Sequence, residues 1–229
     1  MALILCIETA TKNCSVALSD KGAILAFREA RSDQYIHSEK LHLFCKEVMQ
    51  EAGKHLNDLD AIAIGIGPGS YTGLRIGLSA AKGFAFTLQI PLVSANSLEI
   101  LAVGYLANNP LQVGELLFPM IDARRMEVYT AAFSSEGAAM EEVKALVIDE
   151  NSLEAYEAKQ LILIGDGAAK CKDVLEAKAV KIAEPIYPNA MMLSTLAQQK
   201  LTNGVIDDIA YLEPFYLKEF IAGKPKKLL

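Results

Sequence analysis

The segment AIAIGIGPGSYTGLRIGL, residues 61–78, predicts a buried strand, a glycine loop and a helix in direct succession. It opens with a short apolar run, and glycines then flank a proline between residues 65 and 69. Apolar residues recur at helical spacing from Leu74 through Leu78 to Ala81. Glycines in such a loop let the backbone approach a neighbour closely, and the helix N-terminus offers unpaired N–H groups to an anion.

The glycine loop has two interpretations. A phosphate-binding P-loop requires Gly-Lys-Ser/Thr, whereas Gly73 is followed by Leu74 and Arg75. A dinucleotide fingerprint also fails, because Ser70 or Thr72 stands where the third glycine is required. We therefore favour a tight turn that lets the helix pack close to a sheet, with direct phosphate binding as the alternative.

The helix after this loop is rich in small side chains. Glycine inside a helix costs up to about 1 kcal/mol relative to alanine, so its repeated use indicates that something packs very close to that face. The neighbour is either the sheet of the same chain or another subunit. The small residues concerned are Gly73, Gly77 and Ala81 at a spacing of four, with Ala80 and Gly83 nearby.

The composition is that of a globular chain with a sizeable core. The 229 residues are 52% hydrophobic and 22% charged, with a formal net charge of −6. This net negative charge argues against direct binding of nucleic acid by the chain alone, so any RNA would be bound through a partner. Four cysteines without CxxC spacing, no long apolar run and no basic leader predict reduced thiols, no membrane span and a cytoplasmic protein.

Each half of the chain opens with an apolar strand that ends in an acidic residue at a tight turn. A second strand then runs back antiparallel to the first. The first strand ends at Glu8, and its counterpart ends at Asp122. This repetition predicts an α/β fold of two duplicated lobes, residues 1–107 and 108–229, with the C-terminal segment packing back on the first lobe.

Periodicity and capping residues predict the remaining elements. Strands are expected at 3–7, 14–19, 23–30, 91–93, 116–121, 127–133, 144–148 and 161–164. Helices are expected at 38–52, from Asn96 to about Leu106, at 190–202, after Asn151 or Ser152, and after the glycine turn 165–167.

Catalytic and metal-binding motifs are missing. His37 and His42 are separated by about 140° around a helix, so the two side chains would not ligate one metal from its face. No HExxH and no GxSxG sequence occurs. We therefore predict no metal site and no catalytic residue.

Acids, hydroxyls and glycines at turns are the remaining candidates for ligand binding. Two lobes that present such turns to a common cleft hold ATP in the actin, Hsp70 and sugar-kinase type of fold. The alternative is that the acids merely cap their hairpins. The candidate nucleotide-binding residues are Glu8, Thr9, Thr11, Asp122, Gly165 and Gly167.

Four segments together resemble the TsaB (YeaZ-like) family, the non-catalytic paralogues of the TsaD/Kae1 subunit that makes threonylcarbamoyladenosine in tRNA. They are residues 5–11, 65–77, 122–129 and 165–168. The resemblance implies two lobes of the actin/Hsp70/sugar-kinase (ASKHA, ribonuclease H-like) fold. It also implies no required cofactor, with at most weak ATP or ADP binding at a lobe or subunit interface.

The resemblance also implies lost chemistry. The catalytic paralogue carries two metal-ligating histidines four residues apart, and the matching positions here are Ser97 and Leu101. A serine and a leucine cannot replace that pair of ligands. The expected role is a scaffold for a TsaD-type catalytic subunit, joined by a TsaE-type ATPase, with tRNA contacted only through the complex.

The family's subunit interface is a bundle of the first two helices of each partner. Without its partner, the same surface would form a homodimer. Competing hypotheses are an ATP-dependent enzyme that uses Glu8 or Asp122, and a glycoprotease-like peptidase that acts on its paralogue. The implied partner-binding residues are Leu41, Phe44, Val48, Gly73, Gly77, Ala80 and Ala81.

Overall fold

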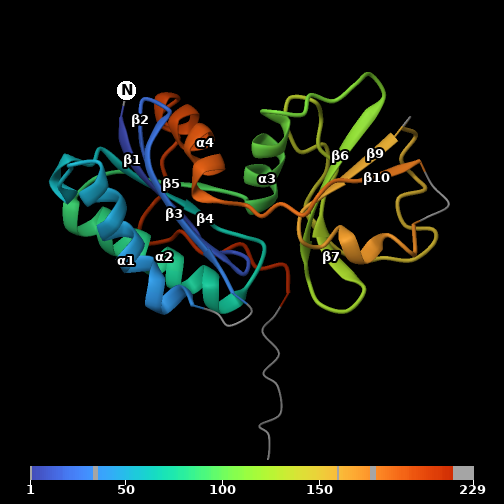
Figure 1. The fold of residues 1–229 in the computed structure, drawn as a ribbon, viewed down its shortest axis with the longest axis horizontal. Coiled ribbons are helices and arrows are strands. Elements are labelled where there is room, and N and C mark those ends of the chain that lie inside the picture. Colours follow the sequence, from blue (N-terminus) through green and yellow to red (C-terminus); the bar gives the residue numbers. More distant parts are fainter. Residues whose placement is uncertain (1, 33–35, 159, 176–178, 219–229) are drawn as a thin grey trace, which may run out of the picture.

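The first lobe is built around the strand β1, Leu3–Glu8, which is buried along its whole length in a computed structural model. The structure describes residues 2–32, 36–158, 160–175 and 179–218. Its first sheet has the order β3-β2-β1-β4-β5 (Figure 1). The pairings of β1 with β2 and of β2 with β3 are antiparallel, and β4 and β5 continue the sheet in parallel. The other strands are β2 (Asn13–Asp20), β3 (Ala23–Arg31), β4 (Ala61–Gly65) and β5 (Leu92–Ala95).

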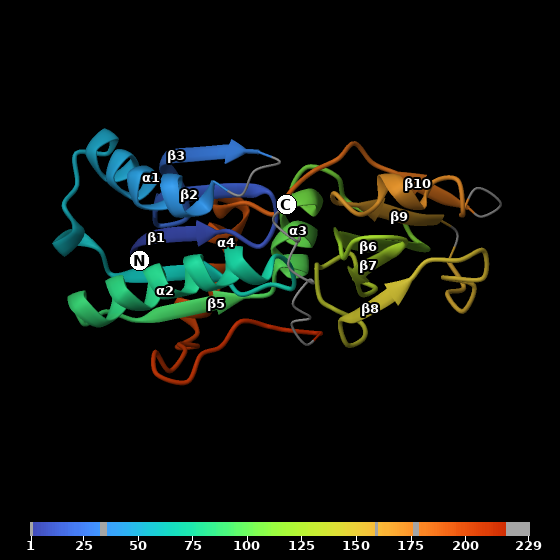
Figure 2. The same ribbon diagram turned by 90° about the horizontal axis from the view of Figure 1, so that it is seen from below.

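Helices cover both faces of this sheet (Figures 1 and 2). The helices α1 (His37–Glu51) and α2 (Tyr71–Leu88) pack on one face, and α4 (Ala190–Thr202) packs on the other. Alternate residues of β1 therefore serve two cores: Leu5 faces α1 and α2, and Cys6 faces α4. Burial on both faces explains why β1 is continuously apolar rather than alternating. The helix α4, far along the chain from the other elements of this lobe, thus completes the first lobe.

The second lobe repeats the same strand arrangement. Its sheet has the order β10-β9-β6-β7-β8, in which β6 pairs antiparallel with β7 and parallel with β9. The helix α3, Ser97–Leu106, lies between the lobes (Figure 1). The described residues also form two short 3-10 helices, η1 (Leu56–Asp58) and η2 (Ala169–Cys171). The strands are β6 (Glu115–Asp122), β7 (Glu127–Thr130), β8 (Lys144–Val147), β9 (Gln160–Ile164) and β10 (Val180–Ile182).

The predicted elements of the first lobe are confirmed with small shifts at their ends, but two helices predicted in the second lobe are wrong. Residues 150–155 form turns, where Leu153 adopts a left-handed conformation with φ of 71° that a helix cannot accommodate. After the second glycine turn the chain forms only η2, because the N–H of Cys171 bonds to Ala168 in the tighter i→i+3 pattern. Among the described residues, no helix is long and apolar enough to cross a lipid bilayer.

The small residues of α2 have different surroundings. A Cβ at Gly73 would lie 2.3 Å from the carbonyl oxygen of Thr9, and a Cβ at Gly77 would lie 2.2 Å from Thr9 Oγ1. These two glycines therefore let α2 approach the β1–β2 turn of its own chain. Gly83 differs, because no heavy atom of the described residues outside its chain neighbours and the nearby backbone of its own helix lies within 4 Å of its would-be Cβ. Packing within the chain thus accounts for Gly73 and Gly77 but not for Gly83.

We expect Gly73→Ala to lower the free energy of unfolding by about 1–3 kcal/mol, because the added methyl overlaps a backbone carbonyl that is held in the β1–β2 turn. Gly83→Ala is the matched control in the same helix and should raise that free energy by up to about 1 kcal/mol. Urea unfolding of both variants measures the difference. Equal stability of the two variants would contradict the close packing of α2 on Thr9.

Candidate functional site

Glu8 ends β1 as a fully buried carboxyl group. Its Oε1 accepts a hydrogen bond from the Ala10 N–H at 2.6 Å, and its Oε2 accepts one from the Ser97 hydroxyl at 3.0 Å. Space beside it is minimal, because a Cβ at Gly65 would lie 1.9 Å from Oε2. Glycine at the end of β4 is therefore a requirement of the buried acid.

The electrostatics of Glu8 are dominated by burial. Loss of solvent raises the pKa of Glu8 from 4.5 to about 7, and hydrogen bonds from Ala10, Ser97 and Thr9 only partly offset that rise. None of these partners is a cation. The carboxyl group therefore holds a proton at mildly acidic pH.

The two predicted hydroxyl residues lie in the same buried turn. Thr9 has no exposed surface, and its Oγ1, beneath α2, has no hydrogen-bond partner among the residues that the structure describes. Thr11 is 5% exposed, and its Oγ1 accepts from the N–H of Asn13 at 3.2 Å. The glycine loop closes over this turn, where the Ser70 N–H donates to the Ala10 carbonyl at 2.6 Å. A nucleotide therefore has no direct access to Thr9 here, and the binding role of these residues stays a prediction.

The second-lobe candidates form a more open cluster. Asp122 is exposed, accepts a hydrogen bond from the Arg124 N–H at 3.0 Å and forms an ion pair with Lys170. Asp166 accepts from the Asp122 N–H at 3.1 Å, and burial raises the pKa of Asp166. Sequence reasoning missed Asp166 and Lys170, although Asp166 stands inside the glycine turn that it had singled out.

The glycines of that turn pack against the end of β6. Gly165 has a φ of 100°, and a Cβ there would lie 2.3 Å from the Met120 carbonyl oxygen. A Cβ at Gly167 would lie 3.1 Å from the Asp122 backbone nitrogen. Close packing explains both glycines, and a contact with nucleotide stays a prediction for them and for Asp122.

The helix α3 joins the two halves of the predicted site. Ser97, its first residue, binds Glu8 of the first lobe. Leu101 lies one turn later against the second lobe, where its Cδ2 would be 2.9 Å from a Cβ at Gly165. The surrounding core spans both lobes and includes Leu98, Leu101, Leu117, Ile121 and Ile164.

A metal does not fit these positions. The Ser97 hydroxyl is committed to Glu8, and Leu101 is fully buried and carries no donor atom. Within the part of the chain that the structure describes, no group of three or more His, Cys, Asp or Glu side chains is placed to hold a metal ion. The residues at this junction therefore have a structural role in joining the lobes.

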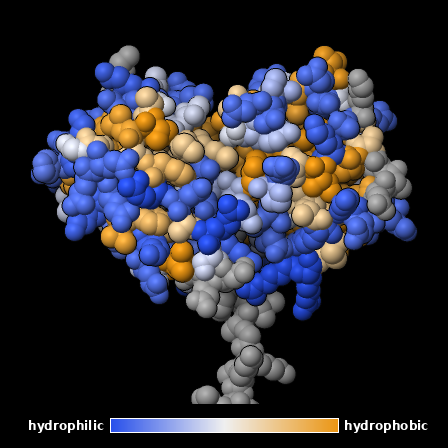
Figure 3. Space-filling model, viewed as in Figure 1, coloured by the Kyte–Doolittle hydropathy of each residue, from blue (hydrophilic) through white to orange (hydrophobic). Residues whose placement is uncertain are grey.

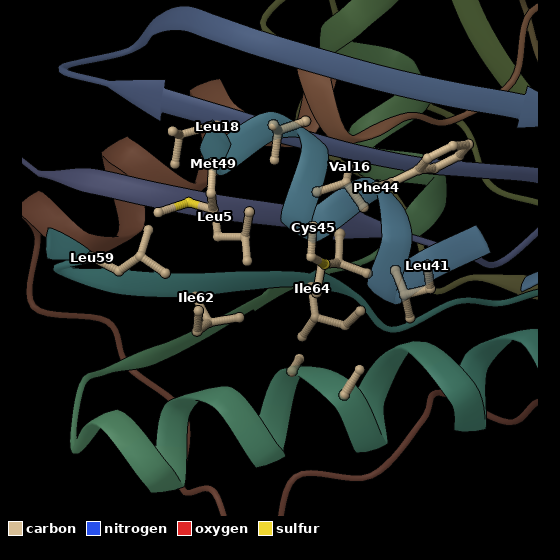
Figure 4. Close-up of a cluster of buried hydrophobic side chains, with 14 of the residues drawn as sticks. Leu5, Val16, Leu18, Leu41, Phe44, Cys45, Met49, Leu59, Ile62 and Ile64 are labelled. Carbon is tan, nitrogen blue, oxygen red and sulfur yellow. The ribbon is translucent and has the colours of Figure 1, made fainter. Parts of the chain in front are cut away.

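The residues predicted to bind a partner lie mainly in the core of the first lobe. Figure 4 shows Leu41 and Phe44 of α1 among side chains of the sheet, and Val48 is also fully buried. Ala80 and Ala81 belong to the same core, and Gly73 and Gly77 contact Thr9. Partner binding by these residues stays a prediction that the structure does not test.

The outer surface of α1 and α2 is formed by other residues. Leu43 of α1 is 43% exposed, and Phe86 of α2 is 76% exposed. His42 and Phe84 meet between the helices with ring centroids 6.0 Å apart, and Gly83 is open to solvent. We call His42, Leu43, Gly83, Phe84 and Phe86 the α1–α2 surface. Sequence reasoning missed Leu43 and Phe86. The feature that could have identified them is an apolar residue that lies outside the core-facing stripe of its helix.

Comparisons with known proteins identify relatives along nearly the whole chain. The family model described as TsaD, tRNA N6-adenosine threonylcarbamoyltransferase, matches residues 33–224. The Escherichia coli tRNA threonylcarbamoyladenosine biosynthesis protein TsaB is 29% identical over 96% of both chains. The Bacillus subtilis TsaB is 32% identical over 94% of this chain and 93% of its own.

Solved structures agree with the fold. YeaZ from Pseudomonas aeruginosa superimposes with a TM-score of 0.81 at 28% identity, covering 95% of this chain and all of that one. The activator of 2-hydroxyisocaproyl-CoA dehydratase from Clostridium difficile, solved with bound ADPNP, has a TM-score of 0.52 at 7% identity over 89% of this chain and 97% of its own. The predicted ASKHA-type α/β fold is confirmed by these neighbours.

Glu8→Gln tests the buried carboxyl group. Between pH 4.5 and about 7 the native state binds more protons at Glu8 than the unfolded state, so the stability that protonated Glu8 contributes is lost as the pH rises through this window. Glutamine has no proton to lose, so its contribution to stability does not change in this window. Between pH 4.5 and about pH 8, the free energy of unfolding of the variant should therefore rise relative to that of wild type by up to about 3 kcal/mol. Urea unfolding across the pH range measures that gain, with the exposed Glu150→Gln as the matched control. A stability difference between Glu8→Gln and wild type that does not change with pH would contradict a buried, proton-holding Glu8.

Proposed function

This chain belongs to the TsaB (YeaZ-like) family within the TsaD/Kae1 family, and we propose that it is a non-catalytic subunit supporting a TsaD-type catalytic subunit. Its full-length relatives are tRNA threonylcarbamoyladenosine biosynthesis proteins, and this chain takes part in that tRNA modification. The finer proposal is that the chain binds its catalytic paralogue and a TsaE-type ATPase, and reaches tRNA only through the complex.

Two features of the lobe junction support a non-catalytic role. The positions that match the paralogue's metal ligands are Ser97, which is bonded to Glu8, and Leu101, which is packed in the interlobe core. The acids that an ATP-dependent enzyme would need are also engaged. Glu8 is fully buried, and Asp122 is paired with Lys170. Within the described part of the chain, no specific contact favours the enzyme or the peptidase hypothesis.

The α1–α2 surface is the proposed contact with the catalytic subunit, and its exposure carries the proposal. Phe86 and Leu43 expose apolar side chains on neighbouring helices, whereas large apolar residues elsewhere in these helices are buried or half-buried. Gly83 leaves a gap where a partner side chain or helix can approach the backbone. The same surface would pair two copies of this chain when the partner is absent.

A nucleotide is proposed only as a weak ligand at a lobe or subunit interface. Among the predicted nucleotide-binding residues, Asp122 is exposed to solvent at its hairpin. It lies next to Lys170 and the Gly165–Gly167 turn. Lys170 is a suitable cation for a phosphate oxygen once its pairing with Asp122 is exchanged. No part of the proposed scaffold role requires this ligand.

Gly83→Arg tests the proposed interface. The arginine would stand in open space, so the isolated chain should remain folded, but it would place a charged side chain in an apolar contact. We expect Gly83→Arg to abolish the complex with the TsaD-type subunit that wild type forms, as measured by size-exclusion chromatography with light scattering.

Ala155→Arg in the second lobe is the matched control, because it adds the same side chain at an exposed position away from α1 and α2. It should bind like wild type. Gly77 is unsuitable for this test, because any larger side chain there meets Thr9 within the chain. A Gly83→Arg variant that still forms the heterodimer would place the interface elsewhere. If the wild-type chain forms no complex with the TsaD-type subunit, the scaffold proposal is wrong.

A further inference from the structure

Residues 205–218, here called the C-terminal strap, follow α4 along the first lobe. Asp207 covers the edge strand β5: its N–H donates to the Leu92 carbonyl at 2.8 Å, and its Oδ2 accepts from the Ser94 N–H at 2.6 Å. Further on, the Ala210 carbonyl accepts from Lys82 Nζ of α2 at 3.3 Å. The strap is thus fixed to the first lobe by backbone and side-chain bonds.

The strap then crosses the glycine loop. The Phe215 N–H donates to the Ile66 carbonyl at 2.8 Å. Tyr216 stacks on Tyr71, the first residue of α2, with ring centroids 4.8 Å apart. Arg75 completes this stack, because its Nε donates to the Tyr216 hydroxyl at 3.1 Å and its guanidinium carbon lies 4.0 Å from the centre of the Tyr71 ring. These contacts direct the last described residues toward the second lobe.

The strap reaches the second lobe at β7. Lys218 forms an ion pair with Glu127, and its Nζ lies 5.9 Å from the centre of the Tyr129 ring. The side chains of Lys218 and Glu127 are 40% and 21% exposed. A partly exposed ionic contact, with a cation over an aromatic ring, therefore links the strap to the second lobe.

The lobes are joined much more firmly at α3. Its residues Leu98, Leu101 and Ala102 are fully buried in a core shared with the second sheet. Figures 1 and 2 show α3 and the end of the strap at separate places along the lobe junction, and Figure 3 shows an open notch between the lobes at the end away from the strap. The junction thus combines an apolar joint with a separate ionic contact.

We propose that the C-terminal strap is an interlobe latch, in which the Lys218–Glu127 pair holds the lobes together at the glycine-loop end and its release lets the second lobe rotate about α3. An apolar core keeps its contacts during a small rotation, whereas a partly exposed ion pair is weakened by salt and by loss of either charge. This inference does not depend on the proposed partner.

Interlobe distance measurements on charge-reversed variants test the latch. Spin labels at Gln199→Cys in α4 and Lys181→Cys in β10 report one distance between the lobes, because both positions are exposed and all four native cysteines are buried. Labelled chains are diluted with unlabelled protein, so that only distances within one chain are measured. The variants are Lys218→Glu, Glu127→Lys and the two combined.

We expect a narrow distance distribution for wild type and a width about twofold larger for each single reversal, as the lobes sample a second arrangement. The combined reversal restores opposite charges and should restore the narrow distribution, and about 1 M salt should broaden the wild-type distribution. Lys172→Glu, an exposed charge reversal on the second lobe, should behave like wild type.

Single reversals with the wild-type distribution would overturn the latch. A combined reversal as broad as the single ones would also overturn it, because the effect would then not arise from the pair. Far-UV circular dichroism of each variant shows that the lobes are folded, so a broadened distribution that the combined variant reverses cannot come from misfolding.

Discussion

The hydrogen bond from Ser97 to the buried carboxyl group of Glu8 is the contact on which the centre of the molecule depends. It ties the end of β1 to the start of α3, which is the helix between the lobes. The buried acid needs donors, because an isolated charge in the core is costly, and a glycine at residue 65, because no side chain fits beside it. The same acid therefore constrains a strand end, a glycine and a helix start that are far apart in the sequence.

From this contact α3 extends to the second lobe through Leu101 and the core around it. These contacts are made by Ser97 and Leu101, the two positions that the family resemblance matches to the metal ligands of the catalytic paralogue. The Ser97–Glu8 hydrogen bond and the apolar core around Leu101 thus form a structural joint between two sheets of the same strand order. Such a joint fits the proposed role of a subunit that contributes a surface to a complex, and the outer faces of α1 and α2 carry the exposed side chains Leu43 and Phe86.

Sequence reasoning predicted the features that are encoded locally. Apolar runs identify β1 and β4, and the repeated strand that ends in an acid identifies both lobes through Glu8 and Asp122. Interactions between distant residues were not predictable in this way: Asp166 binds the Asp122 backbone from 44 residues away. Helical periodicity finds the apolar face of α1 but does not say whether that face meets a sheet or a partner, and here Leu41 and Phe44 meet the sheet. Ser152 looks like a helix cap but bonds back to Asp149 and makes a turn.

The most direct test is a reconstituted reaction that measures threonylcarbamoyladenosine in tRNA by mass spectrometry of its nucleosides. The TsaD-type subunit, the TsaE-type ATPase, tRNA and the activated threonylcarbamoyl donor are combined with and without this chain. If this chain is a scaffold subunit, the modified nucleoside forms only when this chain and the TsaD-type subunit are both present. This chain without the TsaD-type subunit then forms no product. Product formed by this chain without the TsaD-type subunit, or full activity of that subunit in its absence, would contradict the proposed role.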